Sequence, residues 1–279
     1  MSLAGLFAIT RPLNAVTAGL AAIVAYLIAT GTVLPEALLL FCVVTLVTAA
    51  GNVINDYFDV EIDRVNRPGR PIPSGQVSLP AARAYAVTLF LAGILVSLFT
   101  SGLCTLIAVF NSLLLLIYAA RLKRTPLFGN ITVAYLAASM FLFGGAPGGL
   151  PGLLHVMPFA LMTFFAMLAR ELIKDGEDVE GDKASGAVTI PLRYGMKATM
   201  FLALFCAVLG VAASFIPFPW WGPWYVYGIL IVDGIILFSC LKATGCTTPR
   251  ELIASKASTY LKAGMFASLV IFTLSSLFL

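Results

Sequence analysis

Residues 36–63 read EALLLFCVVTLVTAAGNVINDYFDVEID, and this stretch contains both signals that decide the fold of the chain. Its first part, 36–55, is almost entirely apolar and has the length of a helix that crosses the roughly 30 Å hydrocarbon core of a bilayer. Carboxylates crowd together directly after it. The stretch therefore predicts a membrane-spanning helix that ends in a group of acidic side chains.

Similar apolar runs recur along all 279 residues. The chain is 60% hydrophobic and 11% charged, with a mean hydropathy of +1.00, whereas soluble domains average about a quarter charged. Backbone groups in lipid need internal hydrogen bonds, and continuous apolar runs exclude the alternating strands of a barrel. We therefore expect an all-α integral membrane protein, a single domain over 1–279. The nine expected spans are 13–33, 36–55, 81–100, 103–120, 131–150, 153–172, 198–216, 224–243 and 259–279.

Histidine and cysteine chemistry is excluded by the same composition. The single histidine, His155, is expected close to the turn that precedes the sixth span, and one histidine cannot form a His-rich metal site or a His-based triad. The five cysteines lie mostly within apolar runs and lack paired metal-type spacing, which is typical of packing residues.

Basic residues predict the orientation in the membrane. All seventeen Lys and Arg residues fall at the N-terminus, in alternate connections after spans 2, 4, 6 and 8, or in the span ends that adjoin those connections. Because cytoplasmic loops carry an excess of Lys and Arg, we expect the N-terminus and the charged loops in the cytoplasm. The odd number of spans then places the C-terminus outside.

Acidic residues form two groups at corresponding places along the chain. One group follows span 2 and the other follows span 6. Their members are Asp56, Asp59, Glu61 and Asp63, then Glu171, Asp175, Glu177, Asp178, Glu180 and Asp182. This placement predicts two parallel four-helix halves plus one extra helix, on span order and motif position rather than on sequence identity between the halves.

Within each group the spacing points oxygen atoms in one direction. Asn55, Asp59 and Asp63 are four residues apart, as are Asp178 and Asp182. A step of four advances a helix by only about 40°, so we expect the first three on one face of an extended span 2. A hard divalent cation relieves the repulsion of gathered carboxylates, and Mg²⁺ suits a site completed by phosphate oxygens. The alternative is that both stripes are solvated helix ends.

Cations stand beside these stripes. Arg64, Arg67 and Arg70 follow the first group, and Lys123 and Arg124 open the charged loop after span 4. Guanidinium and ammonium groups are suited to phosphate oxygens.

These features together resemble the UbiA-type intramembrane prenyltransferase superfamily. The resemblance covers nearly the whole chain and is carried by four segments: Asn55 to Asp63; the run NRPGRPIPSG over 66–75; Asp178 to Asp182; and Tyr118 through Lys123 and Arg124 to Gly129 and Asn130. It implies nine transmembrane helices with aspartate-rich motifs after helices 2 and 6.

The resemblance also implies roles for individual residues. Two Mg²⁺ ions bridging a prenyl diphosphate would be bound by Asn55, Asp59, Asp63, Asp178 and Asp182, with Asp56 and Asp175 as further candidates. Asp59, Asp63, Asp178, Asp182 and Lys123 are the expected catalytic residues, and Arg67, Arg70 and Lys123 would bind the diphosphate.

Further candidates lie nearer the acceptor. Arg11 would bind an acceptor phosphate with help from Asn14, the alternative being an interfacial arginine that sets topology. Tyr118 and Tyr135 are candidates for shielding an allylic cation, although most aromatic residues in such helices pack or anchor.

Within the superfamily, the Arg67 to Gly75 run and the opening Thr10 to Asn14 look most like the archaeal branch that makes digeranylgeranylglyceryl phosphate. This implies transfer of a geranylgeranyl group from geranylgeranyl diphosphate to geranylgeranylglyceryl phosphate in ether-lipid biosynthesis. An aromatic acceptor, such as 4-hydroxybenzoate or another quinone precursor, is the alternative. The expected partners are a prenyl diphosphate, a lipid-like acceptor and membrane lipids, with no nucleic acid and no protein partner.

Two other classes compete with this interpretation. Carboxylates, repeats and a span broken at Gly144 to Gly149 would suit a secondary transporter or ion channel, but ionisable groups then lie near the midplane, where this sequence places only Asp233. A membrane phosphatase or alcohol phosphatidyltransferase also pairs aspartates with metal. The phosphatidyltransferase pattern crowds them into one helix pair, whereas here they divide between two distant loops.

Overall fold

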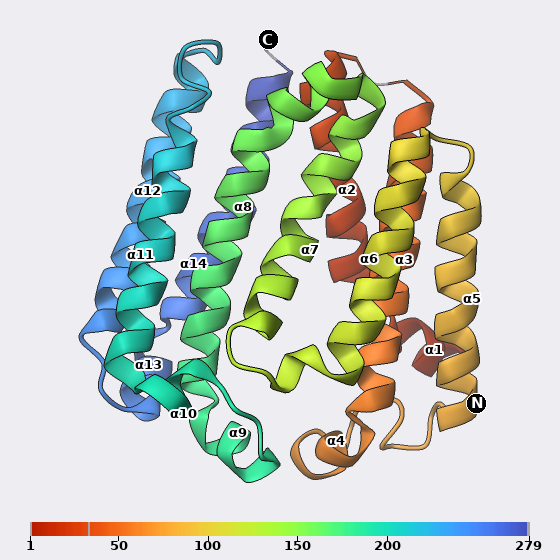
Figure 1. Ribbon diagram of the computed structural model, residues 1–279, viewed down its shortest axis with the longest axis vertical. Coiled ribbons are helices and arrows are strands. Elements are labelled where there is room, and N and C mark those ends of the chain that lie inside the picture. Colours follow the sequence, from red (N-terminus) through yellow and green to blue (C-terminus); the bar gives the residue numbers. More distant parts are fainter. Residues whose placement is uncertain (1, 33, 278–279) are drawn as a thin grey trace. The chain divides into compact units, whose positions relative to one another are not determined.

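All regular secondary structure in the described part of the chain is helical. The computed structural model describes residues 2–32 and 34–277, and for Ala184 and Ser185 the backbone only. The chain forms two compact units: unit 1 contains Met1–Leu122 and Met140–Leu153, and unit 2 contains Lys123–Ser139 and Leu154–Leu279. Their helices are labelled in Figure 1.

Long apolar helices account for most of both units. Eight segments of the described chain are long and apolar enough to cross a membrane, and one of them, Phe128–Glu177, contains two long helices. The nine long helices are α2 (Pro12–Thr30), α3 (Glu36–Phe58), α5 (Leu79–Ser97), α6 (Gly102–Ala120), α7 (Phe128–Gly145), α8 (Gly149–Glu177), α11 (Met196–Ser214), α12 (Pro223–Thr244) and α14 (Ala257–Ser276). The expected all-α fold is confirmed, and each expected span lies mainly on one long helix, although 131–150 also extends through Ala146–Gly148 to the start of α8. The ends of the first and last spans, at 33 and at 278–279, lie outside the described residues.

The glycine-rich stretch after α7 connects two helices instead of breaking a span. α7 ends at Gly145, the 3₁₀ helix η2 covers Ala146–Gly148, and α8 begins at Gly149. Gly149 adopts φ +63°, a left-handed conformation that glycine tolerates best. A Cβ on Gly144 would lie 2.3 Å from the carbonyl oxygen of Ala22, so α7 and α2 approach closely here. The stretch from Gly144 to Gly149 is therefore not the broken membrane span that would have suited a transporter.

In unit 1, α3 is the central helix and packs against α2, α5 and α6. Small side chains permit these contacts, because a Cβ on Gly19 or Gly93 would collide with a side chain of α3. The large buried side chains include Tyr26 and Leu40. This packing fixes α3, which carries the first acidic group at its C-terminal end.

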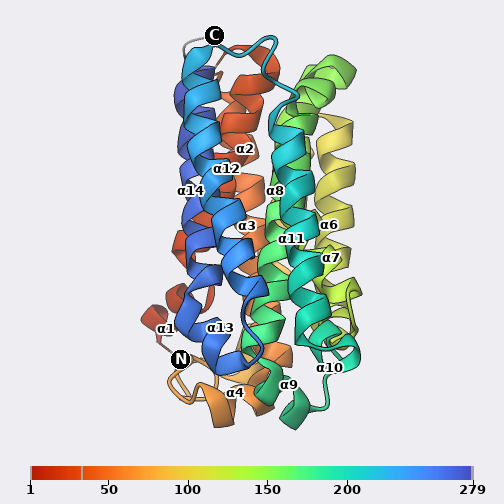
Figure 2. The same cartoon turned by 90° about the vertical axis from the view of Figure 1, so that its left-hand side faces the viewer.

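In unit 2, α12 packs against both α11 and α14, and Figure 2 shows the three helices side by side. Aromatic rings of Phe159, Trp221 and Tyr225 pack together in the core. The Tyr225 hydroxyl donates to the carbonyl oxygen of Ser214, and the Ser214 hydroxyl donates to Asp233 at 2.6 Å. Asp233, the one central charge of the sequence, is thus a buried link between α11 and α12.

Seven short helices lie between or beside the long ones: α1 (Leu3–Ile9), α4 (Val60–Asn66), η1 (Leu122–Arg124), η2, α9 (Val179–Ser185), α10 (Ile190–Tyr194) and α13 (Pro249–Ser255). Two of them bear on function, because α4 contains Glu61 and Asp63 of the first acidic group and α9 contains Glu180 and Asp182 of the second.

Candidate active site

The first acidic group stands at a break between two helices of unit 1. α3 ends at Phe58, Asp59 has φ −91° and ψ 1°, and α4 starts at Val60. The expectation of one uninterrupted extended helix is therefore wrong, because Asp59 leaves helical geometry and caps both elements. Backbone hydrogen bonds nevertheless continue across the break, from Asp59 N to Asn55 O at 3.0 Å and from Asp63 N to Asp59 O at 2.8 Å. The row of oxygen-bearing side chains survives, and the Asn55 amide donates to Asp59 at 2.9 Å.

Asp56 is the buried centre of the first group, with its side chain only 5% exposed. Its Oδ1 accepts from Nη2 of Arg11 at 2.5 Å and from Nη1 of Arg70 at 3.2 Å. The same Nη1 of Arg70 donates to Oδ2 of Asp63 at 2.5 Å. Two guanidinium groups thus compensate two buried carboxylates, as buried charges require.

Backbone geometry explains why Arg11 reaches this position. Arg11 adopts a left-handed conformation, φ 49° and ψ 65°, between α1 and the first residue of α2, Pro12. The carbonyl of Thr10 accepts a hydrogen bond from Asn52 of α3 at 2.9 Å. Arg11 is therefore held against α3 by its neighbour as well as by Asp56.

The second acidic group is built in the same way in unit 2. α8 ends at Glu177, Asp178 has φ −97° and ψ 7°, and α9 starts at Val179. Hydrogen bonds again cross the break, from Asp178 N to Lys174 O and from Asp182 N to Asp178 O, both at 2.9 Å. Asp178 and Asp182 therefore hold the spacing that the sequence predicts.

The buried partner of this second group is an amide and not a guanidinium. Asn130 of α7, 7% exposed, donates from Nδ2 to Oδ2 of Asp175 at 2.9 Å. The neighbouring Glu177 accepts from the Ser258 hydroxyl of α14 at 2.7 Å, which ties the end of α8 to another membrane helix. Asp175 is thus oriented by a neutral donor.

Asp182 lies outside the long helices and has a perturbed acidity. Burial raises its pKa, and the negative charge of Asp178 raises it further, whereas Thr189 and the Lys174 ammonium act in the opposite direction. The carboxylate form of Asp182 is therefore disfavoured unless a cation stands beside it.

A fixed offset relates the two groups. Adding 119 to Asp56, Asp59 and Asp63 gives Asp175, Asp178 and Asp182, and both segments read D-x-x-D-V-E-x-D. The same offset converts Arg11, the partner of Asp56, into Asn130, the partner of Asp175. Both hydrogen bonds join residues 45 apart in sequence. The expected parallel repeat is thus visible in the pairing of Asp56 and Asp175 with residues at the start of the preceding long helix, Arg11 before α2 and Asn130 in α7.

The remaining predicted residues differ in how far they are exposed. In unit 1, Arg67 and Asn14 are exposed and Tyr118 of α6 is half-buried. In unit 2, Lys123 in η1 and Tyr135 of α7 are half-buried. The structure joins Arg11 and Arg70 to the first group. It also joins Asn130 to the second, although the sequence alone gave Asn130 no role.

The donor chemistry fits a hard cation such as Mg²⁺. Among the residues that the structure describes, no three His, Cys, Asp or Glu side chains form a ready metal cluster. In unit 1, the lack of such a cluster agrees with the hydrogen bonds that Asp56 and Asp63 already accept from Arg11 and Arg70. Mg²⁺ needs only one or two protein carboxylates when water and phosphate complete its shell. The oxygen-only pairs Asn55–Asp59 and Asp178–Asp182 meet that requirement.

Comparisons with known proteins agree with this architecture. The model of the UbiA prenyltransferase family matches residues 16–270. A protein of Methanoregula boonei named digeranylgeranylglyceryl phosphate synthase is 60% identical over all of both chains, and one of Methanoculleus marisnigri with the same name is 53% identical over 99% of each.

Solved structures show the same fold. A structure described as digeranylgeranylglyceryl phosphate synthase in membranes has a TM-score of 0.86 and 36% identity, with 99% of both chains covered. A UbiA homologue from Archaeoglobus fulgidus bound to GPP and Mg²⁺ has a TM-score of 0.66 and 16% identity, covering 95% of this chain and 99% of its own. The protein is thus a multi-pass membrane enzyme that belongs to the UbiA prenyltransferase family.

Proposed function

We propose that the protein transfers a geranylgeranyl group from geranylgeranyl diphosphate to the free hydroxyl of geranylgeranylglyceryl phosphate and releases diphosphate. The observation that carries this proposal is the end-to-end identity of 60% to a digeranylgeranylglyceryl phosphate synthase. The family match from residue 16 to 270 includes residues of both units, which supports a single catalytic domain over 1–279.

The negative charge of the leaving diphosphate must be neutralised before the acceptor hydroxyl loses its proton. The bond between the allylic carbon and the diphosphate oxygen breaks, and the oxygen keeps the electron pair. The glycerol hydroxyl then forms an ether bond to that carbon and loses its proton. Negative charge develops on the leaving diphosphate, so groups that neutralise this charge lower the barrier.

Acidic residues are proposed to recruit the cation for this step. Asn55, Asp59 and Asp63 in the first group, and Asp178 and Asp182 in the second, would bind Mg²⁺ through oxygen atoms. Bound Mg²⁺ would supply the positive charge that stabilises the departing diphosphate. Asp56 and Asp175, which already accept hydrogen bonds from Arg11 and Asn130, would orient the groups around them.

Cationic side chains are proposed to bind the phosphates directly. Arg70 has two carboxylate partners, Asp56 and Asp63, and would turn toward a diphosphate once a cation occupies Asp63. Exposed Arg67 and half-buried Lys123 would add to the same neutralisation, with the hydroxyl of Tyr118 as a further donor. Arg11 and Asn14 are proposed for the acceptor phosphate, and Arg11 remains 34% exposed while it contacts Asp56.

Apolar surroundings would protect the allylic cation from water. The membrane helices carry aliphatic and aromatic side chains. An isoprenoid tail can pass from the bilayer between these helices. Tyr118 and Tyr135 stay candidates for shielding that cation.

Charge placement supports one orientation in the membrane. We place the N-terminus and all basic connections in the cytoplasm and the C-terminus outside, because the seventeen Lys and Arg residues avoid alternate loops. Labelling of terminal tags in sealed vesicles should detect the two termini on opposite sides. Two tags on one side would overturn this orientation.

A product assay tests the proposed reaction. Purified protein in detergent is given Mg²⁺, geranylgeranyl diphosphate, geranylgeranylglyceryl phosphate and competing 4-hydroxybenzoate, and products are identified by mass spectrometry. We expect the double-chain ether phosphate and no prenylated aromatic product. A prenylated benzoate would keep the chemistry and change the acceptor, whereas a folded sample without Mg²⁺-dependent product would refute the proposal.

A further inference from the structure

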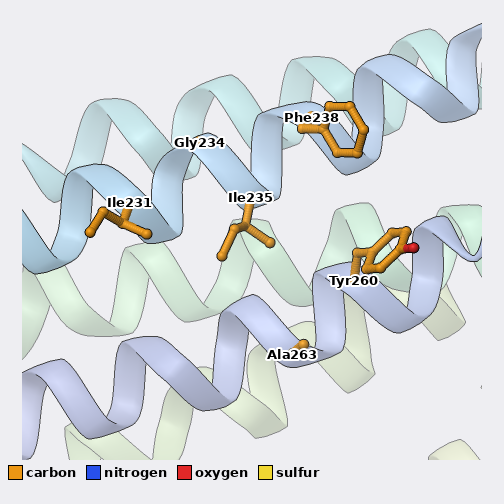
Figure 3. A pocket seen from close by; sticks show the side chains of 6 residues that line it. All are labelled: Ile231, Gly234, Ile235, Phe238, Tyr260 and Ala263. Atoms are coloured by element: carbon orange, nitrogen blue, oxygen red, sulfur yellow. The ribbon is translucent and has the colours of Figure 1, made fainter.

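A shallow apolar groove runs between α12 and α14 in unit 2. It has a volume of about 440 Å³, and six residues line it: Ile231, Gly234, Ile235, Phe238, Tyr260 and Ala263. Figure 3 shows Ile235 of α12 pointing toward α14, with Tyr260 and Ala263 on the facing helix. Ile231 and Phe238 are 67% and 59% exposed, so the groove opens to the surroundings of the helices.

Among the residues that the structure describes, no neighbouring helix packs closely against Gly234. Glycine weakens a helix relative to alanine, so glycines inside membrane helices usually permit close helix contacts. This holds at Gly51 and Gly228, where a Cβ would lie within 2.8 Å of a neighbouring side chain. A Cβ on Gly234 would meet no atom within 4 Å. The space that Gly234 leaves free therefore belongs to the groove.

A cation stands at one end of the groove. Lys242 follows Phe238 by one helical turn on the same face of α12, close to the end of that helix at Thr244. Its ammonium lies 5.6 Å from the centroid of the Tyr260 ring, which lines the groove on the other side. Along the groove the order is therefore aliphatic side chains, then the aromatic rings of Phe238 and Tyr260, then the positive charge of Lys242.

We infer that this groove binds one phospholipid with an anionic headgroup. A lipid has the same order of chemistry: a hydrocarbon chain, an interfacial region and a phosphate. Its chain would lie over Gly234 and Ala263 between the side chains of Ile231 and Ile235, and its phosphate would contact Lys242. The charge of Lys242 favours an anionic headgroup over a zwitterionic one. This occupant is a membrane lipid, separate from the phosphate-bearing substrates of the reaction.

Native mass spectrometry of the full chain in detergent tests this inference. Phosphatidylglycerol is titrated beside phosphatidylcholine and inorganic phosphate. We expect one saturable phosphatidylglycerol, and about fivefold weaker binding in Lys242→Gln. Gly234→Leu should block the groove and weaken binding further. The matched controls are Lys197→Gln and Val208→Leu on α11, which change an exposed lysine and an exposed aliphatic residue away from the groove.

Stability separates lipid binding from a structural role. In lipid-free detergent, Gly234→Leu should unfold at the same temperature as the parent or higher, because its side chain meets open space. Equal affinity for both phospholipids, unchanged binding in Lys242→Gln and Gly234→Leu, or binding of inorganic phosphate alone would each overturn the inference. Because the assay contains no prenyl donor or acceptor, its outcome is independent of the proposed reaction.

Discussion

The two acidic groups share a frame and differ in what compensates their buried charge. In each, a long membrane helix ends just before an aspartate with ψ near 0°, and a seven-residue helix follows. In the first group, Asp56 binds Arg11 and Arg70, whereas in the second, Asp175 binds the amide of Asn130. The carboxylates recur at a fixed offset, and one partner position recurs with them, but its residue changes from Arg11 to Asn130. The difference teaches that the repeated feature is the set of carboxylates, and that each half compensates its own set separately.

Loss of one carboxylate from either group should have the largest effect. Asp59→Asn and Asp178→Asn should each lower turnover by about a hundredfold or more, because each removes a carboxylate proposed to bind the Mg²⁺ that stabilises the leaving diphosphate. Product formation per folded protein is the measurement, with folding checked by thermal unfolding.

Glu61→Gln and Glu180→Gln are matched controls, since they occupy equivalent exposed positions in the two groups. Both should retain activity. If only one of the two aspartate variants were impaired, the functional equivalence of the groups would fail.

Arg70→Gln should sharpen the difference in charge compensation. Without Mg²⁺, it should lower the free energy of unfolding by about 1.5–3 kcal/mol, because Asp63 loses a charged hydrogen bond and Asp56 keeps only Arg11. Added Mg²⁺ should restore part of this loss by replacing the positive charge. Exposed Arg67→Gln is the control and should change stability little. A variant as stable as the parent without Mg²⁺ would contradict the role assigned to Arg70.

Asp182 should give the second group a pH-dependent response to Mg²⁺. Its raised pKa means that its contribution to stability is present at low pH and is lost as the pH rises through that value. In metal-free buffer, Asp182→Asn should therefore unfold at a higher temperature than the parent at pH 8, and at the same temperature near pH 4. Mg²⁺ needs the carboxylate, so the stabilisation by Mg²⁺ should grow with pH in the parent and not in the variant. An identical pH profile in both proteins would refute this assignment.

Two glycines of the second group should respond in opposite directions and with the smallest effects. A Cβ on Gly181 would meet no atom within 4 Å, so Gly181→Ala should stabilise α9 by about 0.4–1 kcal/mol. A Cβ on Gly176 would lie 2.7 Å from the end of the Leu252 side chain and 2.9 Å from the end of Met200, which would have to shift, so Gly176→Ala should destabilise by about 1 kcal/mol. Chemical unfolding of both variants measures this. Stabilisation by Gly176→Ala would show that the end of α8 is not closely packed.

Hydropathy predicted the long helices because crossing a bilayer leaves a strong signal in sequence. It missed the short α4, α9 and α13, since seven residues are too few to leave a periodic pattern. It also placed the end of the sixth span at 172, whereas α8 continues through polar residues to Glu177. Helical backbone does not stop where apolar composition stops.

Some site residues could likewise be predicted from the sequence, and others could not. The spacing of Asp59 and Asp63, and of Asp178 and Asp182, indicated which side chains share a row. The partnership of Asp56 with Arg11 could not be predicted from local spacing, because it depends on the left-handed backbone at Arg11 and on the contact of Thr10 with Asn52. One signal was present in the sequence: the segment D-x-x-D-V-E-x-D, repeated at an offset of 119, would have pointed from Arg11 to Asn130.

The length of α8 bears on how the enzyme meets bilayers of different thickness. Its 29 residues correspond to about 43 Å, which exceeds a hydrocarbon core of roughly 30 Å. Asp178 follows the end of this overhang, so a bilayer several ångströms thicker can be accommodated before its hydrocarbon reaches that carboxylate. α3 has 23 residues, or about 35 Å, and leaves Asp59 a smaller margin. Hydrophobic mismatch in a thick membrane should therefore affect the first acidic group before the second.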